Sequence, residues 1–527
     1  MATESLNDRN CSDASDLASL NSSQLPVIVQ HNTGNSNKEN KLALKDSFFY
    51  NGLPYTILTN RERTTLACLL AVAGLCSAIS MPIYWTALPE LARYFHTSQA
   101  KINYTVTAYL CFQSVAPVFI SSFSDWFGRR PVILLCIISG IAVNIGIACT
   151  RSYGLLIFLR CLLATCLAPL ISICSASVGD FSTRRNRGGL SSLTSGFTLI
   201  GQGFAPFIGS LVDSAWNWQA IFWFSAALEG VFAIIIFLIL PETNRVFVGN
   251  MSVTPKRWFH RSPTLWYFKD RTVPYDEQVL ASFGAVKHKY NPWKPLSLVK
   301  NIPVFIVLIP CSIQFATWTI SQTSMTTHLQ NDYGYSTLHV GLCFFAPGCA
   351  TVLGSFSAGR IIDYIYAKKK SKYITYYEEK VEDGVIISED VPAFNFFRAR
   401  VMLFPYYAIG MTAATIAFGW CLDAHVSIVA ILVFSFMITY LCMFPLSVVV
   451  TLLVDMYPTM AGGATALNNL FRCGMSAIFV SCLDYMEVSL TIGGTYTLMG
   501  GFIILSTISI VWLMMISERM LKAGKLG

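Results

Sequence analysis

The sequence predicts an all-helical protein that crosses a membrane many times. Of its 527 residues, 54% are hydrophobic and only 13% are charged, and the mean hydropathy is +0.53. A soluble domain carries about a quarter charged residues. Each crossing takes about 20 apolar residues, so twelve crossings use roughly 240 residues and leave the charge to loops and tails. This composition excludes a soluble enzyme, a nucleic-acid-binding domain and a single-span receptor.

Twelve apolar runs are long enough to cross, six on each side of a polar stretch at 241–300. They lie at about 66–88, 104–123, 131–149, 153–176, 189–211, 219–240, 302–325, 338–358, 401–421, 426–450, 462–483 and 495–516. We therefore predict two pseudo-symmetric bundles of six helices. The expected parts are a tail (1–64), a first bundle (65–243), a central loop (244–301), a second bundle (302–516) with a loop at 360–400, and a tail (517–527).

The distribution of basic residues predicts the orientation. With the N-terminus placed inside, 32 of the 37 Lys and Arg residues lie on that side. The other side has only Arg93, Lys101 and Arg151, and the remaining two, Arg160 and Arg472, lie within spans. Because basic residues concentrate on the cytoplasmic side of membrane proteins, we expect both termini to be cytoplasmic.

The polar segments and the cysteines carry no catalytic or metal-binding pattern. The tail is poor in apolar residues, which predicts disorder, and it has no apolar run followed by a cleavage site. Aromatic residues in the central loop suggest segments that lie along the membrane surface. The 16 cysteines are scattered without metal-ligand spacing, so we expect them to be reduced and to pack as small apolar residues.

A charged turn lies between the second and third spans, with Asp125, Gly128, Arg129 and Arg130 in it. The carboxylate of Asp125 could face a helix N-terminus, whose unpaired amides carry partial positive charge. Arg129 would then be free to pair with another acid. The alternative is a tight cytoplasmic connection that only follows the positive-inside pattern.

Two further motifs lie within spans of the first half. Arg160 interrupts an apolar run, and a buried cation of this kind usually faces a bundle interior or an aqueous cavity. In the fifth span, Gly201, Ala205, Pro206 and Gly209 place small residues on one face and loosen the backbone bonding. Such a face lets helices approach closely, as small residues do in many membrane bundles.

The second half repeats part of this pattern. Gly359-Arg360 follows Gly128-Arg129 by 231 residues, as expected for a transporter made of two six-helix halves. Asp455 lies just before the eleventh span, at its expected cytoplasmic start, where it could cap a helix or take part in ion coupling.

Together these motifs resemble the major facilitator superfamily, and within it the fungal family of twelve-span drug:proton antiporters. The superfamily's loop reads Gly-x-x-x-Asp-Arg-x-Gly-Arg-Arg or Lys, and this chain has Ser121 and Trp126 at two of those places. The segment 240–245 looks like the end of helix 6 in fungal drug exporters. The segments 87–91 and 462–473 resemble the quinidine-resistance and dityrosine-transporter branch.

The resemblance implies a cytoplasmic charge network and a coupling residue. Asp180 is expected to pair with Arg129, with Arg187 in the Arg-Gly that follows; the alternative is solvated loop charge. Arg160 is expected to take part in proton coupling, although the family's Gly four residues later is Ala164 here. The alternative role for Arg160 is structural, with its side chain bonded to neighbouring carbonyls.

The resemblance also implies that the fifth span carries an antiporter pattern. In the family this pattern reads Gly-x-x-x-Gly-Pro-x-x-Gly-Gly, and Ala205 and Ser210 replace two of its glycines. Ordinary helix packing is the alternative.

The proton carrier should be an ionisable residue in a cavity. The acids within or beside spans are Glu229, Asp455 and Asp484, with Glu90 and Glu487 nearer the outside. We take Glu229 and Asp455 as candidates, although Glu229 lies on a span that is peripheral in this fold and could serve packing or the lipid interface.

Polar and aromatic residues on the central spans are candidates for the substrate cavity. They are Tyr84, Trp85, Tyr109, Gln113, Gln202, Gln314, Trp318, Gln322, Tyr440, Asn468, Asn469 and Arg472. Aromatic walls with few fixed charges suit amphipathic or aromatic molecules, including weak acids and cationic drugs.

The function implied is a proton-coupled antiporter that exports drugs, weak acids or aromatic amino-acid derivatives such as dityrosine by alternating access. No Gly-x-x-x-x-Gly-Lys-Ser/Thr loop is present, so a proton gradient rather than a cofactor is the expected drive. The expected partners are a small-molecule substrate, protons and the lipid bilayer, with no nucleic acid and no second subunit. The expected location is a fungal plasma membrane or prospore membrane. The alternatives are a proton-coupled nutrient symporter and a membrane sensor that transports nothing.

Overall fold

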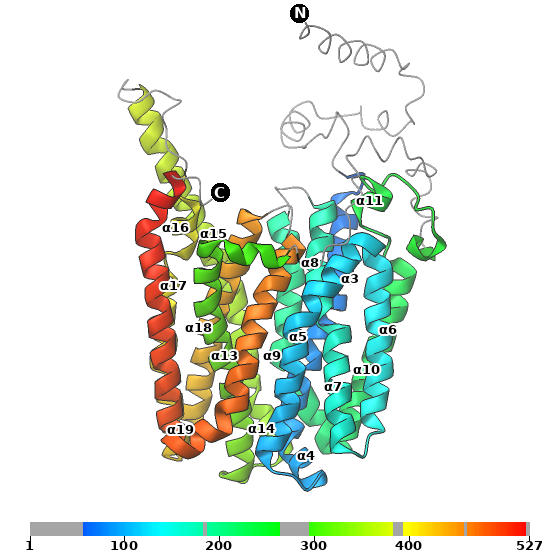
Figure 1. The fold of residues 1–527 in the computed structure, drawn as a ribbon, viewed down its shortest axis with the longest axis vertical. Helices are drawn as coiled ribbons and strands as arrows, with labels where there is room; N and C mark the ends of the chain where they lie inside the picture. The colour runs from blue at the N-terminus through cyan, green and yellow to red at the C-terminus, as the bar shows by residue number, and fades with distance from the viewer. Residues whose placement is uncertain are drawn as a thin grey trace, which may run out of the picture.

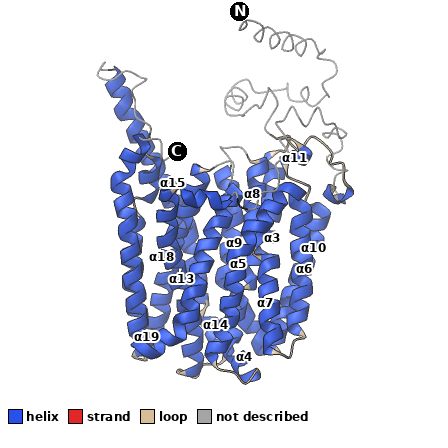
Figure 2. Ribbon diagram, in the orientation of Figure 1, coloured by secondary structure: helices blue, strands red, loops and turns tan. Residues whose placement is uncertain are grey.

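The computed structural model describes residues 56–182, 187–263, 293, 295–382, 394–457 and 461–522. Residues 1–55 of the predicted tail and about half of the aromatic central loop lie outside these residues. The predicted end of the tail at residue 64 is wrong, because the first helix begins at Asn60, where the side chain of Thr59 caps it. Within them, every regular element is a helix (Figure 2).

The first half contains six crossings, of which the first and fourth are broken. In chain order its elements are α3 (Asn60–Ser80), η2 (Pro82–Ala87), α4 (Leu88–Tyr94), α5 (Gln99–Phe127), α6 (Arg129–Ala148), α7 (Tyr153–Leu167), α8 (Pro169–Phe181), α9 (Arg187–Ala215) and α10 (Trp218–Ile239). Pro82 and Pro169 stand at the first position of the segments that follow the breaks, where the missing N–H of proline costs least.

The second half follows a set of short helices. These connecting helices are α11 (Arg245–Val248), η3 (Trp258–His260) and η5 (Pro295–Lys300). The second half itself consists of α13 (Ile302–Asn331), α14 (Thr337–Cys343), α15 (Phe345–Glu382), α16 (Phe396–Val401), α17 (Phe404–Asp423), α18 (Ile428–Met456) and α19 (Ala461–Lys522).

Ten ranges of the described chain are long and apolar enough to cross a membrane. The last, Gly462–Arg519, contains two helices, because α19 turns back at Thr491, whose φ of 65° and ψ of 171° are not helical. Figure 1 shows its two arms (orange and red) running in opposite directions from this turn. The 29-residue α9 also runs the length of the bundle. The described residues therefore make twelve crossings, and the predicted fold class is confirmed.

The most buried crossings lie between the two halves. In both the first crossing and α13, 83% of the most apolar window is buried, against 39% in α10 and 33% in α19. Trp85 of η2 contacts Trp318 of α13 edge to face, with ring centroids 5.8 Å apart, so the two halves meet along these crossings. The outer helices carry exposed Leu, Ile and Phe side chains, as expected of lipid-facing surfaces.

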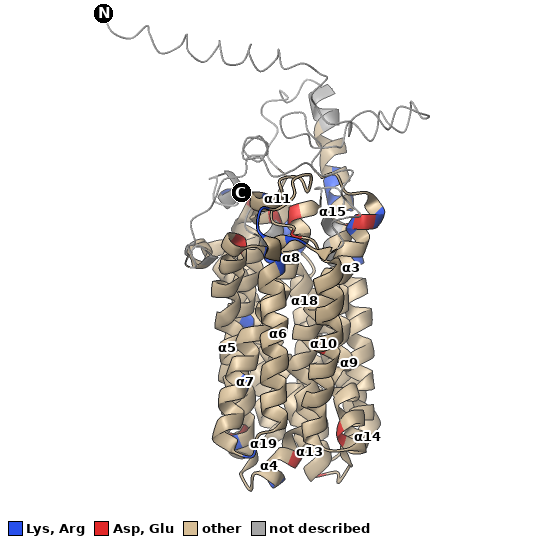
Figure 3. Ribbon diagram, turned by 90° about the vertical axis from the view of Figure 1, so that its right-hand side faces the viewer, with Lys and Arg blue, Asp and Glu red and all other residues tan. Residues whose placement is uncertain are grey.

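Charged residues gather at one end of the bundle, where α8, α11 and the end of α15 lie (Figure 3). We name this the charged end. The opposite end, with α4 and α14, is named the α4 end (Figure 1).

Candidate functional site

The turn between α5 and α6 holds a buried ionic cluster at the charged end. Gly128 ends α5 with a φ of 115°, a conformation that side-chain-bearing residues rarely adopt, so the chain can turn at once into α6. Arg129 forms an ion pair with Asp125 one turn back, and its Nε donates to Asp180 Oδ2 at the end of α8, 3.1 Å away. Its Nη1 also donates to Ser124 Oγ at 2.7 Å. The cluster thus joins the ends of three crossings.

A carboxylate that the sequence analysis did not assign to the site caps α6. The fully buried carboxylate of Glu242 accepts from the backbone N–H groups of Arg129 at 2.9 Å and Arg130 at 3.3 Å. His260 Nδ1 lies 3.0 Å from the same carboxylate. The expectation that Asp125 would face a helix N-terminus is therefore wrong for α6, because the carboxylate of Asp125 pairs with the side chain of Arg129 instead.

The side chain of Arg130 caps the C-terminal end of α10. Its nitrogens donate to the carbonyl oxygens of Phe237, Leu240 and Phe259 at 2.7–2.8 Å. The last carbonyls of a helix have no partner within it, and a basic side chain satisfies them well. Arg187 begins α9, but its side chain lies outside the described residues.

The second half has an equivalent cluster, built on a different arginine from the one that the sequence echo indicates. Arg400, on α16 before α17, lies 2.9 Å from Asp363 of α15 and 3.0 Å from Asp455. Its guanidinium also lies 4.3 Å from the ring centroid of Tyr366. Arg360 is exposed within α15, because this helix continues past it to Glu382 without a turn. Asp455 belongs to the last turn of α18 and not, as expected, to the start of the next crossing.

Arg160 lies fully buried in the middle of the first half. Its guanidinium carbon is 3.9 Å from the ring centroid of Tyr84 and 4.6 Å from that of Tyr109. Its Nη1 reaches the carbonyl of Ser80 at 3.5 Å, whereas Nε and Nη2 find no hydrogen-bond partner among the described residues. The tyrosine hydroxyls are held by Thr105 and Ser80 at 2.9 and 3.2 Å. At this site, a guanidinium cation therefore lies against two aromatic rings, and two of its nitrogens remain available to donate hydrogen bonds.

A second arginine lies in the middle of the second half. The guanidinium carbon of Arg472, on α19, is 4.6 Å from the ring centroid of Phe315. Arg472 Nε, both amide atoms of buried Gln314 and the Oδ1 atom of Asn468 have no hydrogen-bond partner within the part of the chain that the structure describes. Buried polar atoms are nearly always bonded to protein or water, so these atoms indicate water or ligand in the interior.

The remaining predicted cavity residues differ in burial. Gln322 and Asn469 are buried, and Trp318 is buried with its Nε1 donating to Thr439 Oγ1 at 3.1 Å. Gln113, Gln202 and Tyr440 are only partly buried, on α5, α9 and α18, and Tyr440 stacks in parallel on Phe436. The contacts that join predicted residues are those of Arg160 with Tyr84 and Tyr109 and that of Trp85 with Trp318.

One face of α9 packs on the first crossing through its small residues. A Cβ atom on Gly201 would overlap the side chain of Leu75, and one on Gly209 would overlap the backbone carbonyl of Ile83. Ala205, between them, is fully buried. The spacing of four puts all three on one side of the helix, so α9 and the first crossing approach to backbone contact.

Another face of α9 packs on the second half. The side chain of Ser210 fills the space beside Gly341 of α14, where a Cβ atom would overlap it. Phe207 contacts Phe345 edge to face with centroids 6.1 Å apart. Pro206 lies inside the helix, where it removes one backbone hydrogen bond. α9 thus connects the first crossing with the opposite half.

Glu229 is buried between α10 and α6 instead of facing lipid. Its Oε1 accepts from Asn144 Nδ2 at 3.0 Å, and its Oε2 has no hydrogen-bond partner within the described ranges. A Cβ atom on Gly140 would lie 3.2 Å from Oε2, so the glycine makes room for this carboxyl.

Hydrogen bonds join the halves near the α4 end. Asn103 of α5 donates to both carboxylate oxygens of Asp484 of α19, at 3.1 and 3.2 Å. Ser481, one turn earlier, donates to Thr107 at 3.2 Å. Since these bonds cross between the halves, they must break if the halves separate at this end.

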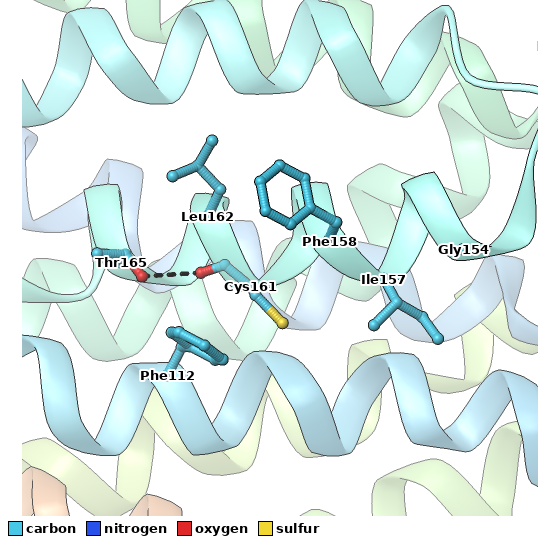
Figure 4. A pocket seen from close by; sticks show the side chains of 7 residues that line it. All are labelled: Phe112, Gly154, Ile157, Phe158, Cys161, Leu162 and Thr165. Atoms are coloured by element: carbon cyan, nitrogen blue, oxygen red, sulfur yellow. Dashed lines mark hydrogen bonds between the residues drawn. The ribbon is translucent and has the colours of Figure 1, made fainter.

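A groove of about 350 Å³ lies on the outer surface between α5 and α7. Figure 4 shows its lining residues, Phe112, Gly154, Ile157, Phe158, Cys161, Leu162 and Thr165, with Phe112 across from the helix that carries the others. Phe112 and Phe158 are exposed, and the lining is almost entirely apolar. Its position and lining suit a lipid chain better than a polar substrate.

Residues 70–480 match the sequence profile of the Major Facilitator Superfamily. The chain belongs to this superfamily. It is 37% identical over 464 residues to the MFS antiporter QDR2 of Candida albicans, with 88% of this chain and 90% of the relative covered. It is 36% identical over 456 residues to the multidrug transporter AQR1 of Candida glabrata (86% and 76% covered), and 32% identical over 482 residues to quinidine resistance protein 1 of Saccharomyces cerevisiae (88% and 84%).

The solved structures that resemble this one support the fold. The proton:xylose symporter XylE bound to 6-bromo-6-deoxy-D-glucose matches with a TM-score of 0.60 at 13% identity, covering 87% of this chain and 97% of that one. A partially occluded inward-open structure of XylE from E. coli matches with a TM-score of 0.60 at 14% identity, covering 86% of this chain and 98% of that one. These major facilitator relatives are transporters and not enzymes. At this identity, XylE shows the fold alone.

Proposed function

We propose that this major facilitator protein is a proton-coupled antiporter that exports small organic compounds, including drugs, weak acids and aromatic amino-acid derivatives such as dityrosine. The observation that carries the proposal is the 37% identity, over 88% of the chain, with a relative named an antiporter. The proton gradient supplies the drive without a cofactor, and the protein acts as a monomer. Its location is a fungal plasma membrane or prospore membrane.

The charged end faces the cytoplasm in this proposal. The cluster of Arg129 and the cluster of Arg400 both lie at the side to which 32 of the 37 basic residues were assigned. Arg93, Lys101 and Arg151 belong to the opposite side. The basic excess supports cytoplasmic termini.

The middle of the molecule suits aromatic and amphipathic compounds. Arg160 and Arg472 offer unsatisfied donors, which an organic acid could accept, and each guanidinium lies against aromatic rings. Trp85 and Trp318 add flat apolar surface where the halves meet. A cationic drug would use the aromatic faces rather than the arginines.

Alternating access requires the halves to part at each end in turn. At the α4 end, the bonds of Asn103 with Asp484 and of Ser481 with Thr107 hold the halves together. At the charged end, Gly462 of α19 approaches Ala176 of α8 so closely that a Cβ atom on it would lie 2.8 Å from that side chain. Alternating access requires each of these sets of contacts to open while the other stays closed.

The test is substrate flux in vesicles of known orientation, with and without an imposed proton gradient. Quinidine, a short-chain acid and a dityrosine derivative serve as probes. The proposal predicts movement opposite to the proton, lost in Arg160→Ala and kept in the matched control Arg151→Ala, whose side chain is exposed at the start of the same crossing. Movement with the proton would make the protein a symporter. The sensor hypothesis is supported instead if none of the three probes moves and if deletion of residues 1–55 abolishes the response of cells to these compounds.

A further inference from the structure

The last turn of α9 buries a carboxyl group that the sequence analysis did not select. Asp213 is only 4% exposed, and neither of its carboxyl oxygens has a hydrogen-bond partner within the described ranges. A buried ionised carboxylate without a partner is very costly, so such a group normally binds a proton or a counter-charge.

Its position follows from the small-residue face of α9. Gly201, Ala205 and Gly209 recur every four residues, and Asp213 is the next member of the series. Gly209 lies against the carbonyl of Ile83. One turn further along α9, Asp213 meets Glu90 of α4, which lies seven residues beyond Ile83. The face that brings α9 onto the first crossing therefore ends in two carboxyls.

These two carboxyls can bond to each other only through a proton. Asp213 and Glu90 lie close enough for a hydrogen bond between their side chains. Ionised carboxylates accept hydrogen bonds and donate none, so neither satisfies the other while both are charged. With one proton bound, one carboxyl donates to the other, and one of the two unpartnered oxygens of Asp213 gains a hydrogen-bond partner.

The other charged groups near this pair do not neutralise it. Arg93, on the same short helix as Glu90, is exposed. On α14, His339 is exposed and bonded to Ser336 Oγ at 2.7 Å. On α10 the only acid is Glu229, which is bonded to Asn144 of α6.

We propose that Asp213 and Glu90 form a proton-binding site that takes up one proton from the outside and holds it as the α4 end closes. The inference rests on the proposed antiport and names a site for the coupled ion. Ser210, one turn before Asp213, packs against Gly341 of the opposite half, so separation of α14 from α9 admits water to the pair. In that open state the pair takes up a proton from the outside, which forms the hydrogen bond between the two carboxyls before this end closes. Both carboxyls ionise again when the proton leaves toward the charged end, so each cycle moves one proton inward.

Infrared spectroscopy of the full-length protein in lipid nanodiscs tests the site directly. A protonated carboxyl has a carbonyl stretch that is separate from the carboxylate bands. At pH 7, Asp213→Asn and Glu90→Gln should each remove the same band from the wild-type spectrum. Asp363→Asn, in an exposed acid paired with Arg400, is the control and should leave it in place. If Asp213→Asn leaves the band unchanged in a protein that elutes as a single folded species, the proposal is overturned.

Transport separates this inference from the proposed function. Asp213→Asn should lose at least tenfold in proton-driven accumulation of quinidine while keeping downhill quinidine exchange, because its side chain cannot change charge. Asp213→Glu should restore part of the driven flux. Driven flux as high as that of the wild type in Asp213→Asn would contradict the site. Wild-type protein that shows the infrared band but no driven flux would contradict the antiport and not the proton site.

Discussion

The two halves hold their charged ends together with the same arrangement but different surroundings. In each, one arginine before the third helix of the half pairs with an acid from the second helix and another from the fourth. Around Arg129 the acids Asp125 and Asp180 are 52% and 20% exposed, and the buried carboxylate of Glu242 accepts from the backbone N–H of Arg129 and lies 3.0 Å from His260 Nδ1. Around Arg400 the acids Asp363 and Asp455 are 77% and 40% exposed.

This difference shows that two clusters with the same arrangement of charges can contribute very different free energies to the stability of the fold. Removing one partner of a buried ion pair costs about 3–5 kcal/mol, whereas exposed pairs contribute about 0–1 kcal/mol. We therefore expect the first half to depend on its cluster for folding. The second half can form and break its cluster during transport at little cost.

The largest effect is expected for Glu242→Gln. The amide cannot accept from two backbone N–H groups and His260 as a carboxylate does, and a buried charge-assisted network is lost at a cost of about 3 kcal/mol. Thermal unfolding of the purified protein, followed by size-exclusion chromatography, should show a clear drop in melting temperature. Glu518→Gln, in an exposed pair with Arg398, is the matched control and should melt like the wild type. Equal melting of both variants would refute the cap.

Arg129→Ala and Arg400→Ala compare the two clusters directly. Arg129→Ala should cost about 3 kcal/mol, because it removes a buried guanidinium and leaves the partly buried Asp180 without its partner, and Arg400→Ala about 1 kcal/mol. The same melting assay measures both. A second-half variant as unstable as the first-half one would show that exposure does not set the weight of these clusters.

Asp363→Asn should have a small and salt-dependent effect. Its pair with Arg400 is exposed, so its contribution of roughly 0.5 kcal/mol should disappear in high salt. Melting curves at low and high salt for the variant and the wild type should converge as salt rises. A gap that persists at high salt would mean that the pair is effectively buried.

Arg360→Ala should change neither stability nor quinidine flux measurably. The side chain is exposed in the middle of α15, and surface substitutions of this kind stay within about 0.5 kcal/mol. A loss of flux comparable to that of Arg400→Ala would restore Arg360 as the functional counterpart of Arg129.

Composition and hydropathy were enough to predict the twelve crossings, because the bilayer sets both their length and their apolar content. The residues of the first charged turn were also found, since Asp125 and Arg129 are one helical turn apart and the family motif names Asp180. Contacts between loops that are distant in the sequence leave no pattern in the sequence from which they could be predicted. Glu242 meets Arg129 across 113 residues of chain, and nothing local marks it as the cap of α6.

The second half shows how a repeat can mislead. The Gly359-Arg360 echo has the right residues, but the backbone there stays helical, so its arginine points to solvent while Arg400 does the pairing. Asp213 was missed for a related reason. It stands near the end of a span, and its burial depends on packing by segments distant in the sequence, such as α14 against α9, which no local pattern reveals.

The most direct test of the central claim is the pH inside proteoliposomes that hold the purified protein and an internal pH dye. Quinidine is allowed to flow into the vesicles down its own gradient, with no pH gradient at the start. Antiport predicts that the lumen becomes more alkaline as protons leave in exchange, and that Arg160→Ala abolishes the change while Arg151→Ala keeps it. A lumen that acidifies with quinidine entry, or quinidine entry with no pH change, would contradict proton-coupled antiport.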